Sequence, residues 1–313
     1  MFLGVDGGGT KTSYAVIDAD GSVRARHVGP SVSHLAQGFA RATDLLLDGI
    51  GAALNVASIA STDLTYAFLG LPSYGEDSAT TAQMDLMPAK LIEVARYRCG
   101  NDMLCSWAGA LACADGISVI AGTGSIAYGE YDGRTARAGG WGEIIGDEGS
   151  AYWIAREGMN LFSRMSDGRA ARGPLYELVR ARVGIAVDLD LCAQVYGEGV
   201  SSRSAFAAFA PLVNDAARAG DAQAAEIFRR GADELLQCIR AVRQSLGVPD
   251  DVVLPVSNTG GVFQSGSLML EAFRAAVSKA RPPFAYQEPR YQPDIGAALY
   301  AAHLAGRRLT PRI

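Results

Sequence analysis

The chain twice places a glycine-rich turn between two apolar segments that have the length of buried strands. The first turn covers residues 6–12 and follows the apolar run of residues 2–5. The second covers residues 122–125 and follows the apolar run of residues 116–121. In both halves a third strand-like segment comes next. This internal duplication predicts an α/β protein in which a β-β-β-α-β-α core occurs twice, with the two turns on opposite walls of one cleft.

The first turn carries the residue types that bind phosphate. Three consecutive glycines let the backbone turn tightly and leave its N–H groups open to a ligand. Successive N–H groups that face one way form an anion-binding concavity. The Asp6 carboxylate at the strand end then indicates a nucleotide with its metal ion. A plain glycine-rich hairpin remains an alternative. The Walker loop and the dinucleotide fingerprint do not match, because both open a helix and here a strand follows.

The composition is that of a chain with room for two domains and their apolar cores. It has 313 residues, of which 49% are apolar and 19% are charged, and its net charge is −5. The negative charge disfavours nucleic acid, and no apolar run approaches the roughly 18 residues of a membrane span. The five cysteines and three histidines are scattered, so no zinc site or disulfide framework is expected. We expect a cytoplasmic protein that binds neither nucleic acid nor membranes.

The expected elements follow the duplication along the chain. Strands are predicted within residues 2–28, 64–71, 96–100, 116–121, 126–131, 135–138 and 252–257, and helices within residues 35–54, 77–95, 103–114, 150–246 and 295–306. The long helical region interrupts the second half. We therefore expect an N-terminal domain of residues 1–114, on which a C-terminal helix of residues 296–313 packs. Residues 115–295 would form the second domain.

Asp102 lies where a short predicted strand becomes a helix. A carboxylate at this position commonly caps the helix. Its place at a strand end of the first half, facing the same cleft as Asp6, favours a second interpretation. In that interpretation Asp102 accepts a hydroxyl proton during phosphoryl transfer.

The most specific stretch covers residues 139–153, with five glycines among its first eleven residues. Trp141 offers a flat apolar face, Asp147 and Glu148 offer acceptors, and Ser150 can cap the helix that follows. Sugars are bound in this way, by acidic side chains that accept hydroxyl hydrogens and a ring that covers C–H groups. The alternative is a structural loop whose acidic residues favour the helix dipole.

These motifs together resemble a known family. The matching residues are Asp6–Thr12, Asn101-Asp102, Gly122–Ser125, Gly140–Trp153 and the Pro293-x-x-Gly296-Ala297 segment. Across the whole chain they are similar to the N-acetylglucosamine kinases of the BadF/BadG-type ATPase group, in the actin, hexokinase and heat-shock-chaperone ATPase superfamily. The resemblance implies two ribonuclease H-like domains around a central cleft, ATP and Mg²⁺ as cofactors, a sugar substrate and a homodimer.

The resemblance also implies a role for each matching residue. Asp102 would be the catalytic base, and Asp6 would hold magnesium through water. ATP would be bound by Gly8, Gly9, Thr10, Lys11, Thr12, Gly122, Thr123 and Gly124, with Gly260 and Gly261 near its adenosine, and the sugar by Ser33, Trp141, Gly142 and Asp147. Ser33 departs from the family's usual Asn, and a lost contact of this kind is worth roughly 1–3 kcal/mol. The amino sugar therefore stays open, with glucosamine as one possibility.

Three functions are compatible with these residues. The first is an ATP-dependent kinase that acts on the 6-hydroxyl of N-acetylglucosamine or a related amino sugar. The second is an ATPase activator of an acyl-CoA reductase or dehydratase, which would hold an iron–sulfur cluster with cysteines. The third is a non-catalytic sugar sensor, although the first strand begins at Phe2 and leaves no room before it for a DNA-binding helix pair.

Overall fold

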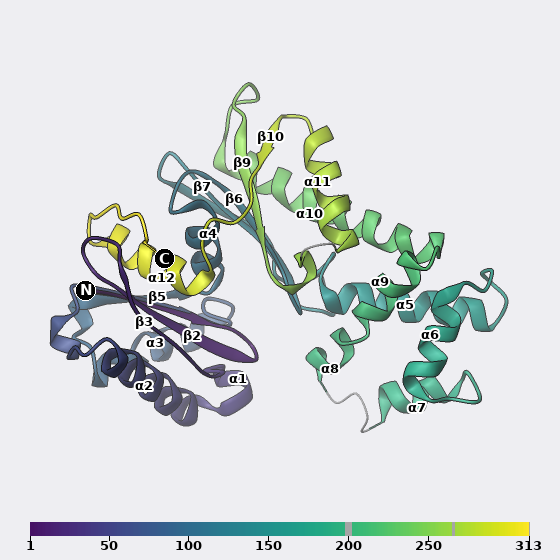
Figure 1. Ribbon diagram of the computed structural model, residues 1–313, viewed down its shortest axis with the longest axis horizontal. Coiled ribbons are helices and arrows are strands. Elements are labelled where there is room, and N and C mark those ends of the chain that lie inside the picture. Colours follow the sequence, from purple (N-terminus) through teal and green to yellow (C-terminus); the bar gives the residue numbers. More distant parts are fainter. Residues whose placement is uncertain (198–201, 265–266, 313) are drawn as a thin grey trace. The chain divides into compact units, whose positions relative to one another are not determined.

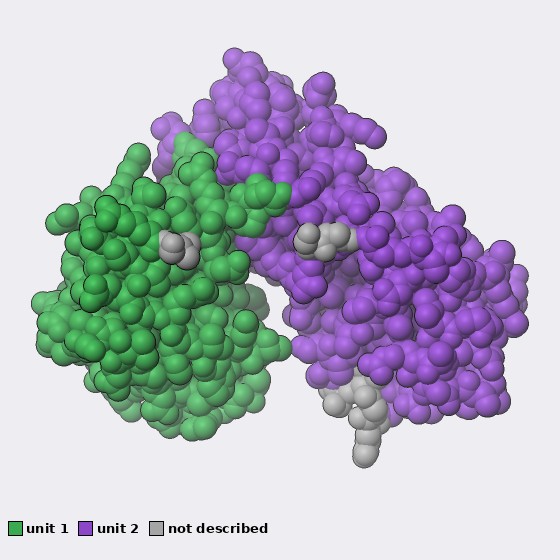
Figure 2. Space-filling model, viewed as in Figure 1, with its two compact units in different colours: residues 1–115, 288–313 green, residues 116–287 purple. Residues whose placement is uncertain are grey.

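The computed structural model describes residues 1–197, 202–264 and 267–312, which form two compact units (Figures 1 and 2). One unit contains Met1–Asp115 and Glu288–Ile313, and the other contains Gly116–Gln287. Each unit has one five-stranded sheet. Among the described residues, no helix is long and apolar enough to cross a membrane.

The first unit is built on a mixed sheet in the order β3-β2-β1-β4-β5. The strands are β1 (Phe2–Gly7), β2 (Lys11–Ile17), β3 (Val23–Pro30), β4 (Tyr66–Leu71) and β5 (Tyr97–Asn101). β1 pairs antiparallel with β2 and parallel with β4, and β4 pairs parallel with β5. Because parallel strands end at the same edge, the residues after β1, β4 and β5 meet there.

Helices α1 (His34–Gln37), α2 (Phe39–Val56), α3 (Ser78–Asp85), α4 (Met103–Leu111) and α12 (Pro293–Leu304) complete this unit. The last helix packs very closely on the sheet, since a Cβ on Gly4 would stand 2.1 Å from the Ala298 nitrogen. Gly296 of this helix is equally close to α4, because a Cβ there would stand 2.2 Å from the Cys105 carbonyl oxygen. Residues 77–95 are not one helix: α3 ends at Asp85, and short 3-10 turns cover Met87–Lys90 and Val94–Arg96. Pro88 has no N–H to continue the α-helical hydrogen bonds.

The second unit repeats the sheet of the first, in the order β10-β9-β6-β7-β8. Its strands are β6 (Gly116–Ala121), β7 (Ser125–Tyr131), β8 (Arg134–Gly139), β9 (Leu254–Thr259) and β10 (Phe284–Tyr286). β6 pairs antiparallel with β7 and parallel with β9, just as β1 pairs with β2 and β4. The predicted duplication is therefore confirmed. The short strand β10 was not predicted, because three residues give no readable alternation.

Helices of the second unit carry most of its core. They are α5 (Ala151–Ser166), α6 (Pro174–Val183), α7 (Asp190–Tyr196), α8 (Arg203–Ala207), α9 (Ala210–Arg218), α10 (Ala222–Leu246) and α11 (Leu268–Lys279). The part of the predicted helical region at residues 198–201 lies outside the described residues. The apolar face of α10 is buried against the sheet and the neighbouring helices, through residues such as Leu235, Ile239 and Val242.

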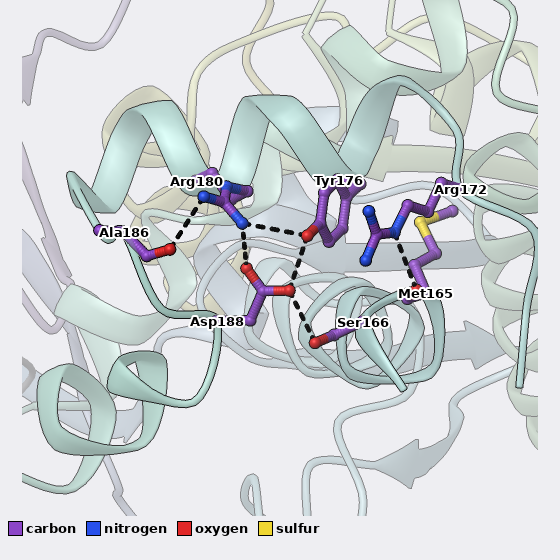
Figure 3. Close-up of polar contacts among 7 residues, drawn as sticks. All are labelled: Met165, Ser166, Arg172, Tyr176, Arg180, Ala186 and Asp188. Atoms are coloured by element: carbon purple, nitrogen blue, oxygen red, sulfur yellow. Dashed lines mark hydrogen bonds and ion pairs between the residues drawn. The ribbon is translucent and has the colours of Figure 1, made fainter. Parts of the chain in front are cut away.

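A polar cluster joins α5 and α6 to the segment that precedes α7 (Figure 3). The Asp188 carboxylate accepts hydrogen bonds from Ser166 and Tyr176, each at 2.7 Å, and pairs with Arg180 at 2.5 Å. Arg172 stacks over the Tyr176 ring, 4.2 Å from its centroid. These partners stabilise the ionised carboxylate, so they lower the pKa of Asp188, with the Tyr176 hydrogen bond as the largest cause.

Candidate active site

The turn between β1 and β2 is held by its backbone and leaves its tip open. The Gly8 N–H donates to the Lys11 carbonyl at 2.9 Å, and the Ser31 hydroxyl donates to the Gly8 carbonyl at 2.8 Å. Gly9, Thr10 and Lys11 are exposed. A Cβ placed on Gly9 would meet no atom within 4 Å, so the protein itself leaves space over the tip. An anion can approach this backbone directly.

Two predicted ligand-binding residues near this turn are buried. Thr12 is fully buried and its hydroxyl accepts a hydrogen bond from the Val32 N–H at 3.2 Å. Its side chain therefore fixes the loop after β3 instead of extending the exposed tip. Ser33 is also buried, and its N–H donates to the Ser31 hydroxyl at 3.3 Å. Ser31, which the sequence did not single out, thus links the Ser33 loop to the first turn.

Asp6 and Asp102 lie at the common edge where β1, β4 and β5 end. Asp6 is paired in register with Gly70 of β4, and Gly70 is paired with Gly100 of β5, two residues before Asp102. The Asp102 side chain makes no capping hydrogen bond to α4. Instead, the Asn101 carboxamide oxygen accepts from the Met103 N–H at 3.0 Å. The capping hydrogen bond expected of Asp102 is therefore not made, and the backbone N–H groups of Asp102 and Met103 favour the ionised form of its carboxyl group.

Both carboxyl groups hold protons more tightly than ordinary aspartates. Burial raises the pKa of Asp102 to about 7, and the exposed Glu76 adds to the rise. Burial, with further contributions from Asp102 and Asp294, raises the pKa of Asp6 to about 8, although Lys11 opposes this. A carboxyl group with a pKa near 7 is suited to accept a proton at neutral pH.

The residues around Asp6 fit a divalent cation that binds together with phosphate. The repulsion of negative charges at Asp6 would be relieved by such a cation, which inverts the local pKa pattern. Among the described residues there is no cluster of three or more side chains that could hold a metal by themselves. Magnesium commonly binds through one or two carboxylates, waters and substrate phosphates, and Asp6 before the open turn is a donor of that kind.

The turn between β6 and β7 has the same position in the second unit but different surroundings. The Gly122 N–H donates to the Gly124 carbonyl at 2.9 Å and closes the turn. The first N–H groups of α5 bind this turn too, with the Ala151 N–H donating to the Gly122 carbonyl at 2.9 Å and the Tyr152 N–H to Thr123 at 3.4 Å. Ser150 caps α5 through the Trp153 N–H at 3.2 Å, as predicted. The loop and the turn therefore form one structure.

Asp147 joins the predicted sugar loop to this second turn. One of its carboxylate oxygens accepts from the Ser125 N–H at 3.2 Å, and the Ser125 hydroxyl donates to the Glu148 carbonyl at 2.7 Å. Asp147 is only 2% exposed and has a φ of +63°. Burial raises the pKa of Asp147, against the Ser125 N–H and Arg203, which stabilise its charge.

Arg203 is the residue of this site that the sequence analysis missed. Its guanidinium contacts the second oxygen of Asp147, and its Nε lies 3.2 Å from a Glu143 oxygen. Arg203 comes from α8, far along the chain from the loop. No local spacing connects the two, so only the folded helical region could reveal the pairing.

The remaining predicted residues lie around the same turn or on the same loop. Gly260 has a φ of +102°, and a Cβ there would stand 2.3 Å from the Ala121 carbonyl, immediately before Gly122. The turn after β9 therefore requires glycine and places Gly260 and Gly261 beside the second turn. Trp141 is 69% exposed, and Gly142 has room around it. An exposed indole beside acidic side chains can cover the C–H face of a sugar.

The candidate residues thus form one group in each unit. In the first unit an open glycine turn accompanies two carboxyl groups with raised pKa values. In the second, a braced turn accompanies an acidic loop with an exposed tryptophan. Two repeated sheets with such turns define an actin/hexokinase-like fold. The chain belongs to the BadF/BadG/BcrA/BcrD ATPase family, whose model matches residues 3–301.

Individual relatives include named sugar kinases. The chain is 26% identical to the N-acetyl-D-glucosamine kinase of Dictyostelium discoideum over 310 residues, which cover 96% of this chain and 97% of the relative. It is 31% identical to the N-acetylmuramic acid/N-acetylglucosamine kinase of Clostridium acetobutylicum over 202 residues, covering 64% of this chain and 65% of the relative. A solved structure of a candidate N-acetylglucosamine kinase from Chromobacterium violaceum has a TM-score of 0.72 and 29% identity, covering 95% of this chain and 97% of that one.

Proposed function

We propose that this protein is an ATP-dependent kinase that phosphorylates the 6-hydroxyl of N-acetylglucosamine or a related amino sugar such as glucosamine. The observation that carries the proposal is the Asp102 carboxyl group, which caps no helix and has a pKa of about 7. It shares a sheet edge with Asp6 and the open glycine turn. The names of the relatives support the same class of substrate.

In the proposed reaction, the sugar hydroxyl oxygen bonds to the γ-phosphorus of ATP, and the bond from that phosphorus to the bridging oxygen breaks. ADP leaves with the electron pair, and the hydroxyl proton passes to Asp102. Gly8 closes the first turn through the Lys11 carbonyl, and the exposed Gly9, Thr10 and Lys11 would bind phosphate oxygens. Gly122, Thr123 and Gly124 would form the second phosphate turn. Thr12 would contribute indirectly, because its hydroxyl fixes the loop after β3 through the Val32 N–H. Magnesium near Asp6 would offset the phosphate charge.

For the sugar, Trp141 would cover the C–H face. Asp147, whose two oxygens are bound to Ser125 and Arg203, would have to accept a sugar hydroxyl as an additional hydrogen bond. Gly142 leaves space beside the indole, and Ser33 would be a further sugar contact, as the family resemblance implies. Gly260 and Gly261 lie beside the second turn and would face the adenosine. A homodimer remains a prediction from the family resemblance, and a cytoplasmic location remains a prediction from the sequence.

A coupled assay of ADP release across a panel of sugars tests the proposal. The panel contains N-acetylglucosamine, glucosamine, N-acetylmannosamine, N-acetylmuramic acid and glucose, each at millimolar concentration with Mg²⁺ and ATP. We expect phosphorylation of at least one hexosamine, and mass spectrometry with periodate cleavage should place the phosphate on oxygen 6. Failure to phosphorylate any hexosamine would falsify the proposal. The Asp102→Asn protein serves as the control for contaminating kinases.

The activator alternative finds no support in the two buried cysteines of the first unit. Cys99 and Cys105 are buried in the first unit, where burial raises the pKa of each thiol far above its usual range. Such thiols are poor cluster ligands, because a thiolate is the form that binds metal. Iron and labile sulfide in anaerobically purified protein would instead favour the activator.

A further inference from the structure

Arg203 is the one cation that contacts the acidic loop among the described ion pairs of this region. Its guanidinium reaches Asp147 with one nitrogen and lies 3.2 Å from Glu143 with another. The Arg203 side chain is 36% exposed, whereas that of Asp147 is 3% exposed. The arginine therefore approaches a buried carboxylate from the solvent side.

Asp147 needs outside support to stay ionised in its position. It is buried, and Glu143 and Glu148 are close enough to repel its charge. Among the described residues, the Ser125 N–H and Arg203 act in the opposite direction. The backbone of Asp147 is also in the left-handed region, with a φ of +63°, which asparagine and aspartate tolerate better than most residues. This backbone conformation is compatible with a side chain that contacts Ser125 and Arg203.

The contact is fitted closely into the second turn. A Cβ on Gly124 would stand 2.1 Å from the Arg203 Nη2 and 2.9 Å from an Asp147 oxygen. The absence of a side chain at Gly124 thus makes room for the ion pair. One Asp147 oxygen is bound to the turn through Ser125, and the other faces Arg203.

We propose that Arg203 is a positioning residue that keeps Asp147 ionised and oriented to accept sugar hydroxyls, and that through Asp147 it also holds the second phosphate turn. The inference rests on the proposed function for its sugar ligand. Beyond that function, the inference says that one arginine of the helical region affects the binding of both sugar and nucleotide. Loss of Arg203 should consequently weaken sugar and nucleotide together, although it need not touch either one.

The protein contains a matched control for the arginine substitution. Arg229 in α10 also pairs with two carboxylates, Glu226 and Asp233, but all three side chains are about half exposed. Surface pairs of this kind contribute little to stability. Arg229→Gln therefore removes the same charge from the same unit without touching the site.

The first test uses ligand-free protein and requires no substrate. The Asp147 carboxyl is followed by ¹³C NMR during a pH titration and is assigned by its loss in Asp147→Asn. We expect Arg203→Gln to raise the titration midpoint by roughly one unit or more, since a nearby opposite charge lowers a carboxyl pKa by that amount. Arg203→Lys, which keeps the charge, should stay near the wild type, and Arg229→Gln should not move it.

The second test is kinetic. In Arg203→Gln the KM values for sugar and for ATP should both rise, and the acid limb of kcat/KM for the sugar should shift upward with the Asp147 midpoint.

An unchanged Asp147 midpoint, with Arg203→Gln folded, overturns the inference, and so does a rise in KM that is equal at every pH. If the wild type phosphorylates no sugar, the proposed function fails, yet the titration still decides whether Arg203 sets the charge of Asp147. Should Arg203→Gln not fold, Arg203→Met, which also removes the charge, takes its place: a raised Asp147 midpoint with a tenfold loss confined to low pH supports the inference, and a wild-type midpoint overturns it.

Discussion

The two glycine turns occupy equivalent places in the repeated sheets, but only one of them is braced. Beyond its own backbone, the turn between β1 and β2 is held by the Ser31 hydroxyl. A Cβ placed on Gly9, at the tip of this turn, would meet no atom within 4 Å. The turn between β6 and β7 is fixed by α5, by Ser125 and by the Asp147–Arg203 pair. Duplication has kept the backbone and changed what surrounds it.

The difference indicates a division of tasks between the two turns. The open turn adjoins Asp6 and Asp102. The raised pKa of Asp102 suits a proton acceptor, and a cation would relieve the charge repulsion that helps to raise the pKa of Asp6. The braced turn shares its supports with the loop of residues 139–149, which we propose to bind sugar, so its shape depends on the side chain of Asp147. Changes near the open turn should therefore affect chemistry or a single ligand, and changes near the braced turn should affect two ligands together.

The largest effect is expected at Asp102. Asp102→Asn keeps the size of the side chain but cannot accept a proton, so kcat should fall by roughly 10²–10⁴-fold. The KM for sugar should change little, because the loss falls on the transition state. Steady-state kinetics with the preferred sugar measure both. A kcat within threefold of the wild type would show that the proton acceptor lies elsewhere.

The next effect is expected at Asp147, on the braced side. Asp147→Asn removes a charged acceptor, and such hydrogen bonds are worth about 1.5–3 kcal/mol, or roughly 10–150-fold in sugar KM. Because Asp147 also binds the Ser125 N–H, the KM for ATP should rise in the same variant. Calorimetric titration with a non-hydrolysable ATP analogue checks this separately. If only the sugar is affected, the second turn does not depend on Asp147.

A pair of glycine substitutions compares the turns directly. Gly9→Ala adds a methyl group to open space, so the melting temperature should stay within about 1 °C while the KM for ATP rises several-fold. Gly124→Ala drives a methyl group into Arg203 and Asp147, and an overpacked site costs typically 1–3 kcal/mol. It should lower the melting temperature and raise the KM of both ligands. Equal melting temperatures for the two variants would contradict the difference in bracing.

The sequence predicted the repeated fold because its turns and strands are local patterns. The strand ends at Asp6 and Asp102 followed from the same reading, since parallel strands bring their ends together. Local patterns were ambiguous where two roles compete, as for Asp102, which only the hydrogen bond to Asn101 resolved. They could not show Arg203, because its partners are joined to it by tertiary packing alone. The sequence could not predict the burial of Thr12 either. A threonine next to a glycine-rich turn is typical of a hydrogen-bond donor to phosphate, and its contact with Val32 arises from tertiary packing.

The open turn also predicts opposite pH responses of activity and stability. Asp102 must be ionised to accept a proton, so kcat/KM should fall as the pH drops below about 7. The folded-state pKa values of Asp6 and Asp102 lie above those of the unfolded chain, so the ligand-free protein loses stability as the pH rises from about 4 through 8. At pH 8, Asp6→Asn and Asp102→Asn should melt a few degrees above the wild type. Equal melting at pH 8 and pH 5.5, by calorimetry without nucleotide, would contradict this.

The smallest effect on activity is expected at Asp188. Its substitution tests whether an aspartate–arginine pair stabilises the fold alone or also supports a ligand site. Asp188 and Asp147 each pair with an arginine in the same unit, but the pKa of Asp188 is lowered and that of Asp147 is raised. The Asp188 charge therefore stabilises the folded state above about pH 4, and the contribution is lost as the pH falls through the lowered pKa. Asp188→Asn should lower the melting temperature at pH 7.5 by roughly 1–4 °C. Its kcat and both KM values should match the wild type, because Ser166, Tyr176 and Arg180 hold helices and no ligand loop. A raised KM in Asp188→Asn would instead show that this cluster supports the sugar loop, and that the two aspartates act as one brace.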